Sequence, residues 1–483
     1  MDLMEKIVAL AKRRGFVYPS SEIYGGMANT WDFGPAGTLL KNNIRDFWWK
    51  RFVLDRDDMV GIDASIFLNP KVWEASGHVA GFTDALIECK NCHNRTRADH
   101  LIEDFLEGNG DKLKEDWKNT SLTTNTSISE AIVKKYISEK KVEGLLVEQL
   151  YDIIQFHKIL CPRCKKFDWT PVRKFNLLFE TSIGILEGEK SKAYLRGEIA
   201  QGIFLNFKNV LNSTRVRVPF GIAQQGKAFR NEITMGQFVH RTLEFDLMEF
   251  EYFIKQEDWE KVFEMWRDEM WNFALSLGIR EESLRWREHG EFERSFYSEK
   301  TMDIEYKYPF GFKEMFGIAY RTDYDLKNHQ EHSGKDLNYI DPITNEKYIP
   351  HVVEPTFGLS RLTGIVLVDA YSEDGDRIVL KLDPKIAPYK VAIFPLLANK
   401  SELVKKAREI YKNLKKNFAV TWDDRGNIGK RYFAQDEIGT PWCVTVDFQS
   451  LDDATVTVRD RDTAKQERVS IDKLLEYFNN KLM

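Results

Sequence analysis

The segment that decides the fold is Phe220–Phe253, which reads FGIAQQGKAFRNEITMGQFVHRTLEFDLMEFEYF. It predicts two strands joined by a polar loop that contains Gly236, a pattern typical of a β-hairpin. Because side chains alternate along a strand, Arg230 and Glu232 share one face of the first strand. This pair is either a salt bridge across the hairpin, the commoner case for an arbitrary pair, or part of a catalytic site.

The second strand of the hairpin places two acids on an apolar face. Glu249 and Glu251 fall on the same side as Leu243, Phe245 and Leu247. Carboxylates in apolar surroundings need a partner. The hairpin therefore carries an arginine and several acids, and the acids are expected to have partners from other parts of the chain.

A second informative segment is Glu354–Arg361, which reads EPTFGLSR and precedes an apolar helical run. Gly358 marks the turn from a strand to this helix. Arg361 then falls in the first helical turn, where free N–H groups and the helix dipole favour an anion. An isolated arginine at this position is more often a surface cap, and the alternative is a phosphate ligand.

Upstream, Leu39–Phe52 predicts a helix with an apolar side, followed by a strand that ends in Pro70. This element is either an ordinary buried helix or part of a subunit interface.

Four of the five cysteines form two CxxC pairs, Cys89 with Cys92 and Cys161 with Cys164. Two such pairs complete a tetrahedral shell for a structural zinc ion. The alternative is a pair of reduced or redox-active dithiols, because the two pairs lie far apart in the sequence. Cys443 has no such neighbour and is expected in a core.

The 483 residues suffice for two or three domains. We expect a catalytic domain from residues 1–88 and 165–383, an insertion at 89–164, and an α/β domain at 388–483, where predicted strands alternate with a helix at Glu402–Phe418. The middle of the insertion, Lys112–Lys141, has the composition of a solvated loop and helix pair that seldom builds a core, so a metal ion would take the place of one.

Charge and hydropathy limit the possible partners. A formal charge of −5 argues against indiscriminate coating of nucleic acid, although a local basic surface can still hold an RNA. There is neither a long apolar run nor a signal-peptide pattern at the N-terminus. We therefore expect a cytoplasmic protein without a membrane partner.

The segment FRNE at 229–232, followed by RTLEF at 241–245, resembles motif 2 of the class II aminoacyl-tRNA synthetases, Glu354–Arg361 resembles their motif 3, and Leu39–Pro70 is similar to motif 1. The resemblance implies an α+β fold: an antiparallel sheet flanked by helices, a zinc-knuckle insertion, a C-terminal α/β anticodon-binding domain, and a homodimer. It also implies catalytic roles for Arg230 at the ATP α-phosphate, Glu232 at the adenine and Arg361 at the γ-phosphate.

Further blocks resemble the homodimeric glycyl-tRNA synthetases. They are DFGP at 32–35, RADH at 97–100, RGEIAQG at 196–202, RTDYDL at 321–326 and QDEIGTP at 435–441. This likeness implies that glycine is activated with ATP and Mg²⁺ and transferred to tRNA(Gly), and that Glu314 is a magnesium ligand.

Two sets of site residues follow from this resemblance. The implied ATP-binding residues are Arg230, Asn231, Glu232, His240, Arg241, Thr242, Leu243, Glu244, Phe245, Glu314, Met315, Gly358, Leu359, Ser360 and Arg361. The implied glycine-binding residues are Arg97, Glu198, Phe245, Asp246, Leu247, Met248, Glu249, Glu354, Pro355, Thr356, Phe357, Gly358 and Ser360.

An acidic pocket suits glycine, because the enzyme must hold the ammonium group and leave no space at Cα. The smallest substrate lets steric exclusion reject every competitor, so no editing domain is needed. The sequence departs from the family at Gly197, usually proline, at Leu243, usually arginine, and at His240, usually phenylalanine. The change at Leu243 puts one basic contact near the nucleotide in doubt.

Three other interpretations remain. A class II synthetase for proline, threonine or serine is disfavoured by the acidic pocket. A non-catalytic synthetase-like protein that binds RNA or DNA would be expected to lose the ATP arginines, which are present here. A zinc-knuckle nucleic-acid module accounts only for the insertion.

Overall fold

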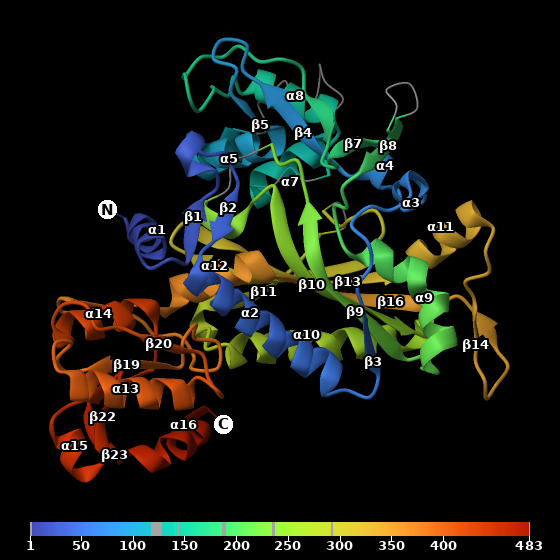
Figure 1. Ribbon diagram of the computed structural model, residues 1–483. Helices are drawn as coiled ribbons and strands as arrows, with labels where there is room; N and C mark the ends of the chain where they lie inside the picture. The colour runs from blue at the N-terminus through green and yellow to red at the C-terminus, as the bar shows by residue number, and fades with distance from the viewer. Residues whose placement is uncertain are drawn as a thin grey trace.

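The predicted hairpin lies within a seven-stranded sheet of order β11-β12-β13-β16-β10-β9-β3 (Figure 1). Strands β9 and β10 are antiparallel and pair from Phe229 opposite Glu244 to Phe220 opposite Phe253, so this prediction is confirmed. The computed structural model describes residues 2–116, 128–140, 142, 144–185, 190–233, 237–290 and 293–482. Gly236 of the connecting loop lies outside the described residues.

Neighbouring strands of this sheet are antiparallel, except that β3 runs parallel to β9. With helices on both faces, the sheet confirms the predicted α+β architecture. The strands are β3 Met59–Ile62, β9 Phe220–Phe229, β10 Glu244–Ile254, β11 Leu284–Glu288, β12 Lys300–Tyr308, β13 Gly311–Thr322 and β16 His351–Gly358.

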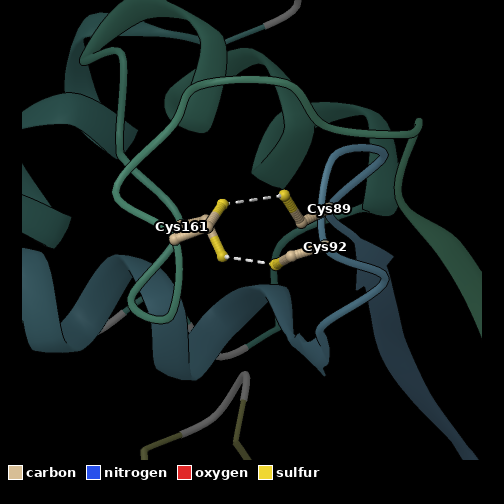
Figure 2. A group of neighbouring side chains, drawn as sticks. Cys89, Cys92 and Cys161 are labelled. Carbon is tan, nitrogen blue, oxygen red and sulfur yellow. Dashed lines mark hydrogen bonds between the residues drawn. The ribbon is translucent and has the colours of Figure 1, made fainter.

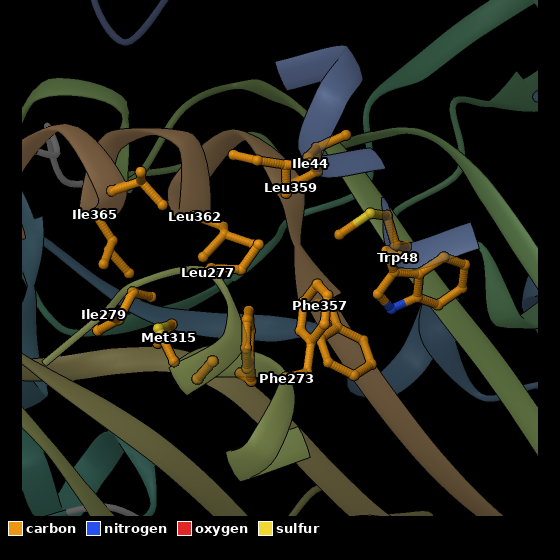
Figure 3. Close-up of a cluster of buried hydrophobic side chains, with 14 of the residues drawn as sticks. Ile44, Trp48, Phe273, Leu277, Ile279, Met315, Phe357, Leu359, Leu362 and Ile365 are labelled. Atoms are coloured by element: carbon orange, nitrogen blue, oxygen red, sulfur yellow. The ribbon is translucent and has the colours of Figure 1, made fainter. Parts of the chain in front are cut away.

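One face of the sheet is covered by an apolar layer from α2 (Pro35–Trp49), α10 (Trp259–Ser276) and α12 (Leu359–Ala370). Figure 3 shows part of this layer, in which the ring of Phe357 lies 5.8 Å from that of Trp48 and 5.5 Å from that of Phe273. On β10, Met248 and Phe250 point into this layer, whereas Glu249 and Glu251 alternate with them and belong to the other face. The apolar layer thus fixes a sheet whose opposite face is free for polar groups.

The predicted helix at Leu39–Phe52 is confirmed as α2, which continues into a π-helical turn at Lys50–Leu54. The predicted strand that ends in Pro70 is wrong. Strand β3 ends at Ile62, and Pro70 is the first residue of α3 (Pro70–Ala75), which Asn69 caps. Proline fixes a helical φ and lacks only an N–H that has no partner in the first turn, so it can begin a helix.

The opposite face of the sheet is partly covered by α9 (Ala200–Thr214) and α11 (Tyr324–Ser333). Shorter elements surround it. They are α1 Leu3–Arg13, β1 Val17–Pro19, β2 Trp31–Phe33, α4 His78–Gly81, β7 Glu180–Ile183, β8 Ser191–Tyr194, β14 Tyr339–Ile340, β15 Lys347–Tyr348, β17 Tyr371–Asp374 and β18 Arg377–Leu380.

The insertion lies above the sheet in Figure 1 and has an apolar core of its own. Its small sheet joins β4 (Thr83–Glu88), β5 (Arg95–Arg97) and β6 (Arg173–Asn176). Helix α5 (Ala98–Asp116) packs on that sheet, and α7 (Glu130–Glu139) and α8 (Val147–Phe156) pack against α5. The expectation that a metal ion would stand in for a core is wrong, because these helices are amphipathic and bury aliphatic side chains such as Ile137 and Ile153.

The C-terminal part forms the predicted α/β domain, with a sheet of order β20-β19-β21-β22-β23. Its predicted helix is confirmed but ends at Leu414 rather than Phe418. The elements are β19 Val391–Pro395, α13 Ser401–Leu414, β20 Val420–Trp422, α14 Ile428–Ile438, β21 Trp442–Val446, α15 Gln449–Asp453, β22 Thr455–Asp460, β23 Gln466–Ser470 and α16 Leu474–Leu482.

This domain joins the catalytic domain through α14, whose Asp436 is completely buried. Asp436 accepts hydrogen bonds from Arg459 of its own domain at 2.8 and 3.0 Å and from Arg377 of β18 at 3.3 Å. Gly439, at φ +80°, ends α14 so close to the last residue of β18 that a Cβ atom would lie 3.0 Å from the carbonyl oxygen of Leu380. Within the described part of the chain, no helix has the length and apolarity needed to cross a membrane.

Candidate active site

Arg230 directly follows β9 and is held by main-chain groups. Its Nε donates to the carbonyl of Gly197 at 3.0 Å, and its N–H donates to the carbonyl of Leu243 at 2.9 Å. The guanidinium lies between two aromatic rings, 5.1 Å from the centroid of Phe82 and 5.4 Å from that of Phe245. Arg230 is therefore a fixed cation at the open end of the hairpin.

The departures at 197 and 243 leave these contacts in place, because both residues act through their backbones. A Cβ atom at Gly197 would lie 3.0 Å from the ring of Phe82 and 3.1 Å from a methyl group of Leu178, so these two side chains pack closely against the glycine. The N–H of Leu243 donates to the carbonyl of Asn29 at 2.9 Å. This hydrogen bond fixes the backbone of the loop and does not depend on the side chain at position 243.

A second cation cluster lies beside Arg230. Glu232 lies 3.8 Å from Arg241, so the acid of FRNE pairs with Arg241 rather than with Arg230, the partner that the salt-bridge interpretation gave it. Arg97 binds Asp84 at 3.0 Å and Asp99 at 2.5 Å. Burial alone would lower the pKa of Arg97, but the hydrogen bond to Asp99 and the charges of Asp99, Asp84 and Glu232 raise it.

The charge of Glu232 therefore acts on Arg97. The ion pairs of Arg97 are with Asp84 and Asp99 rather than with the acids of β10 and β16. Asn231 and Thr242 support the same loop, since Asn231 donates its N–H to Leu177 and Thr242 donates its hydroxyl to the carbonyl of Glu244. Glu244 itself pairs with Lys227 at the surface.

Arg361 lies in the first turn of α12, as expected, with Gly358 as the residue before the helix. Its Nη1 lies 2.8 Å from the carboxylate of Glu314 and 3.1 Å from the carbonyl of the same residue, and its Nε donates to the carbonyl of His240 at 3.3 Å. Burial would raise the pKa of Glu314, but the charge of Arg361 and its hydrogen bond lower it to about 2. This is an ionised acid beside a helix N-terminus.

His240 fills an aromatic position. Its ring meets Tyr308 edge-on at 5.1 Å and lies 3.3 Å through Nδ1 from the hydroxyl of that residue. Burial, and then the positive charge of Arg361, lower the pKa of His240 to about 2. The imidazole is therefore uncharged and serves in place of the phenyl ring usual in the family.

The acids of the sheet converge on the polar face. Glu249 and Glu251 of β10 and Glu354 of β16 each place one carboxylate oxygen within 4.8 Å of the others. Burial raises the pKa of Glu354 to about 7, although Arg321 acts against this shift. Burial and the charge of Glu354 raise the pKa values of Glu249 and Glu251 well above their ordinary range.

Arg321 at the end of β13 is the cation of this acidic group, and the site prediction from the sequence missed it. Its Nη1 donates to both oxygens of Glu354 at 2.9 and 3.0 Å, its Nε lies 2.8 Å from Asp325, and its Nη2 lies 3.6 Å from Glu198. The spacing of Arg321 and Asp325, four residues apart across a strand end, was the available signal.

Glu198 has a second buried partner that the site prediction also missed. His78 Nε2 lies 3.2 Å from its carboxylate, and the amide of Gln201 donates to it at 2.8 Å. Burial opposes ionisation, but His78 and then Arg321 lower the pKa of Glu198. Five segments that are distant in sequence thus meet around one group of buried acids, here called the acidic pocket.

Several predicted contact residues turn their side chains away from this pocket. Strand and helix geometry buries them in the apolar layer on the other face of the sheet. They are Met248, Met315, Phe357 and Leu359. Only their backbones are available to a ligand.

The other predicted residues are divided between the two faces of the sheet. Leu247 packs with Phe245. Asp246 binds Lys41 at 2.8 Å and donates its N–H to the hydroxyl of Ser360 at 2.9 Å, so Ser360 ties α12 to β10. Pro355 is buried and Thr356 half-buried on β16.

The four paired cysteines meet at the edge of the insertion (Figure 2). Cys89 and Cys164 place their sulfur atoms 3.6 Å apart, as do Cys92 and Cys161. Zn–S bonds of about 2.3 Å set the sulfur atoms of a tetrahedron about 3.8 Å apart, so the thiols have the spacing of a zinc shell. Cys443 is buried in the C-terminal domain, as expected.

The chain matches two known domain families and several curated proteins. Residues 84–177 match the family described as glycyl-tRNA synthetase insertion domain 1, and residues 390–481 match the anticodon binding domain. The chain is 50% identical over 484 residues to a glycine–tRNA ligase of Clostridium tetani, covering 99% of this chain and 98% of that protein. A glycine–tRNA ligase of Clostridium perfringens is 50% identical over 480 residues (97% and 96%), and one of Bacillus thuringiensis 49% over 483 residues (99% of each).

Proposed function

The chain belongs to the glycine–tRNA ligase family, and from this membership we propose that it activates glycine with ATP and transfers the glycyl group to the terminal adenosine of tRNA(Gly). The observation that carries the proposal is an identity of about half with such ligases over nearly the whole chain. The acidic pocket beside two fixed arginines supplies the chemistry.

In the first step the glycine carboxylate attacks the α-phosphate of ATP, and pyrophosphate leaves. No enzyme nucleophile is needed, because positioning and charge neutralisation carry phosphoryl transfer. We assign Arg230 to the α-phosphate and Arg361 to the γ-phosphate. The main-chain anchors of Arg230 and the helix N-terminus under Arg361 support these roles.

The adenine is assigned to the cluster at the open end of the hairpin. Glu232 offers a carboxylate to the base edge, and Phe245 offers a ring for stacking. Asn231, Arg241, Thr242, Leu243 and Glu244 complete the loop around the nucleotide, with His240 behind Arg361.

Mg²⁺ is a second requirement of ATP chemistry, and Glu314 is the residue that we assign to it. An ionised carboxylate is the hard oxygen ligand that Mg²⁺ prefers, and the low pKa of Glu314 keeps it charged. When bound, the ion would neutralise phosphate charge next to Arg361.

Glycine is assigned to the acidic pocket. Its ammonium group suits Glu249, Glu354 and Glu198, while Arg321 holds two of these acids in place. We infer that steric exclusion at Cα gives the specificity, because glycine is the smallest amino acid. Arg97 lies toward the nucleotide end of the site and is assigned to the region between the two substrates.

We assign the second substrate, tRNA(Gly), to two further parts of the chain, the insertion and the C-terminal domain. The match of residues 390–481 to an anticodon binding domain supports contact with the far end of the tRNA. The expected setting is the cytoplasm, where tRNA is charged.

The insertion is proposed to hold one structural zinc ion at Cys89, Cys92, Cys161 and Cys164. Four thiols at tetrahedral spacing fit Zn²⁺ better than a redox pair, which would use two of them. Because the insertion has its own core, zinc would fix the two CxxC turns rather than create the fold.

A homodimer is the proposed assembly. The apolar side of α2 is buried within the chain, so the interface must use neighbouring surface. Between β1 and β2, Ile23 and Tyr24 are 89% and 88% exposed and Met27 is 59% exposed, which is a costly apolar surface for a lone subunit. Analytical ultracentrifugation of the wild type beside an Ile23→Asp/Tyr24→Asp variant tests this assembly.

The experiment for the function is ATP–pyrophosphate exchange with each of the twenty amino acids in turn, without tRNA. Exchange that depends on glycine alone is expected. Exchange with another amino acid would refute the pocket assignment, and no exchange at all would favour a non-catalytic relative.

A further inference from the structure

Glu251 is a buried acid to which neither the sequence nor the proposed function gives a role. It lies on β10 two residues beyond Glu249, on the same face. The register that sets Glu249 opposite Thr356 and Tyr252 opposite Val353 also sets Glu251 opposite Glu354. Two carboxyl groups thus face each other directly across neighbouring strands, an arrangement that is unfavourable when both are charged.

In the part of the chain that the structure describes, no cation of the pocket donates a hydrogen bond to Glu251. Arg321 places its Nη1 on Glu354 and its Nε on Asp325. Among the described residues, neither carboxylate oxygen of Glu251 has a hydrogen-bond partner, and the residue is 0% exposed. An ionised carboxylate in this position would be deprived of water and of any counter-ion, which is among the costliest arrangements in a protein interior.

The charged groups around Glu251 come from every element packed against it. They are Glu249 on its own strand, Glu354 on β16, Arg321 on β13 and Asp325 on α11. Three of these four are acids, and the single arginine is already shared between Glu354 and Asp325. The neighbourhood therefore favours an uncharged Glu251, in agreement with its raised pKa.

Position along β10 distinguishes Glu251 from Glu249. Phe245 and Arg230 mark the nucleotide end of the hairpin, and Glu249 lies two residues closer to that end than Glu251. Two strand residues span about 6.6 Å, so the ammonium of a glycine whose carboxylate meets the α-phosphate reaches Glu249 first. Glu251 lies beyond Glu249 and opposite Glu354.

We propose that Glu251 is a positioning residue that keeps its proton when glycine binds and, as an uncharged acid, donates a hydrogen bond to Glu354, directly or through one water. This inference rests on the proposed glycine pocket. The donated hydrogen bond, together with Arg321, fixes the orientation of Glu354 toward the substrate ammonium. The proton also removes a negative charge that would otherwise repel Glu354 and Glu249.

The test compares substitutions that separate charge from hydrogen bonding. Glu251→Leu removes the donor at similar volume and is expected to raise the KM for glycine about tenfold, the loss of roughly one hydrogen bond to a charged group. Glu251→Gln keeps a donor without a charge and should restore the KM to within about threefold of wild type. Glu249→Gln is the matched control, and it should lose about a hundredfold in kcat/KM, because Glu249 is assigned to direct contact with the ammonium.

Two outcomes would overturn the proposal. Glu251→Gln could be as damaging as Glu249→Gln, which would mean that the charge of Glu251 is needed. Alternatively, Glu251→Gln could shift the acid limb of the pH profile of kcat/KM to lower pH, which would mean that it had removed a negative charge beside Glu354.

A measurement on the wild type avoids dependence on folding of the variants. Infrared spectroscopy at neutral pH should show the carbonyl band of an un-ionised buried carboxylic acid that persists when glycine is added and is absent from Glu251→Gln. The lack of such a band in the wild type would refute the proposal. This result is independent of the exchange assay, so failure of the glycine function and failure of the role of Glu251 are distinguishable.

Discussion

Arg361 binds Glu314 twice, with its Nη1 2.8 Å from the side-chain carboxylate and 3.1 Å from the main-chain carbonyl. These contacts join the first turn of α12 to β13 in the absence of a nucleotide. These two contacts order the Arg361 side chain before a nucleotide binds. Binding of a phosphate therefore costs less side-chain entropy.

Arg361→Ala should therefore raise the KM for ATP by about 10- to 100-fold, the effect of losing a charge-assisted contact. Exchange kinetics at varied ATP and saturating glycine measure the change. Arg361→Lys keeps the charge but not the two-point anchor, and should recover only part of the loss. An unchanged KM for ATP in Arg361→Ala would remove this residue from the nucleotide site.

Arg230→Ala should abolish adenylate formation while the fold remains intact. Among the described residues, the guanidinium is held by the carbonyl of Gly197 and by no acid that the substitution would leave unpaired, so the melting temperature should change little. Single-turnover formation of glycyl-adenylate measures the loss. Wild-type activity, or an unfolded variant, would count against the assigned role.

His240→Phe should retain activity within about threefold. With a pKa near 2 the imidazole carries no charge at neutral pH, so the substitution keeps an uncharged ring against Tyr308. The affected hydrogen bond to the Tyr308 hydroxyl is long, at 3.3 Å. A loss of a hundredfold or more in kcat/KM for ATP would show that the ring nitrogen itself acts on the nucleotide.

Glycine activation should fall as the pH drops below about 7. The pKa of Glu354 is raised to about 7, so below that pH the residue gains a proton and loses the charge that binds the ammonium. We expect kcat/KM for glycine to fall about tenfold per pH unit on the acid side. The KM for ATP at saturating glycine serves as the internal control, and a flat glycine profile down to pH 5 would contradict this assignment.

Cys161→Ser should reduce the zinc content from one ion per chain to nearly none, as measured by plasma mass spectrometry. Cys443→Ala, which alters a cysteine in the other domain, should keep the ion. Hydrogen exchange should increase at the two CxxC turns and less at α8, because the insertion keeps its apolar core. Full zinc content in Cys161→Ser would exclude the four-sulfur shell.

The sequence predicted the parts of the site that lie on regular elements. Alternation along Phe220–Phe253 placed Glu249 and Glu251 on one face, and the position of Gly358 placed Arg361 at a helix start. These are local properties, set by the periods of strand and helix. The resemblance to a family gave such residues roles that spacing alone could not.

The rest depended on contacts between distant segments. Arg321, Asp325 and His78 join the acids of the sheet from elsewhere in the chain, and no periodicity links them. The contiguous stretches assigned to ATP and glycine included residues such as Phe357 that the pleat turns to the other side. Prediction from the sequence also missed the amphipathic helices of the insertion. Their average composition is polar, and an average does not show that the apolar residues gather on one face of each helix.

Asp436 joins the two large domains through a carboxylate shared by Arg377 and Arg459. Separating the domains would take a buried charge from one of its two partners, at a cost of about 3–5 kcal/mol. The acidic pocket and the C-terminal domain therefore stay at one distance from each other. An RNA that touches both must match that distance.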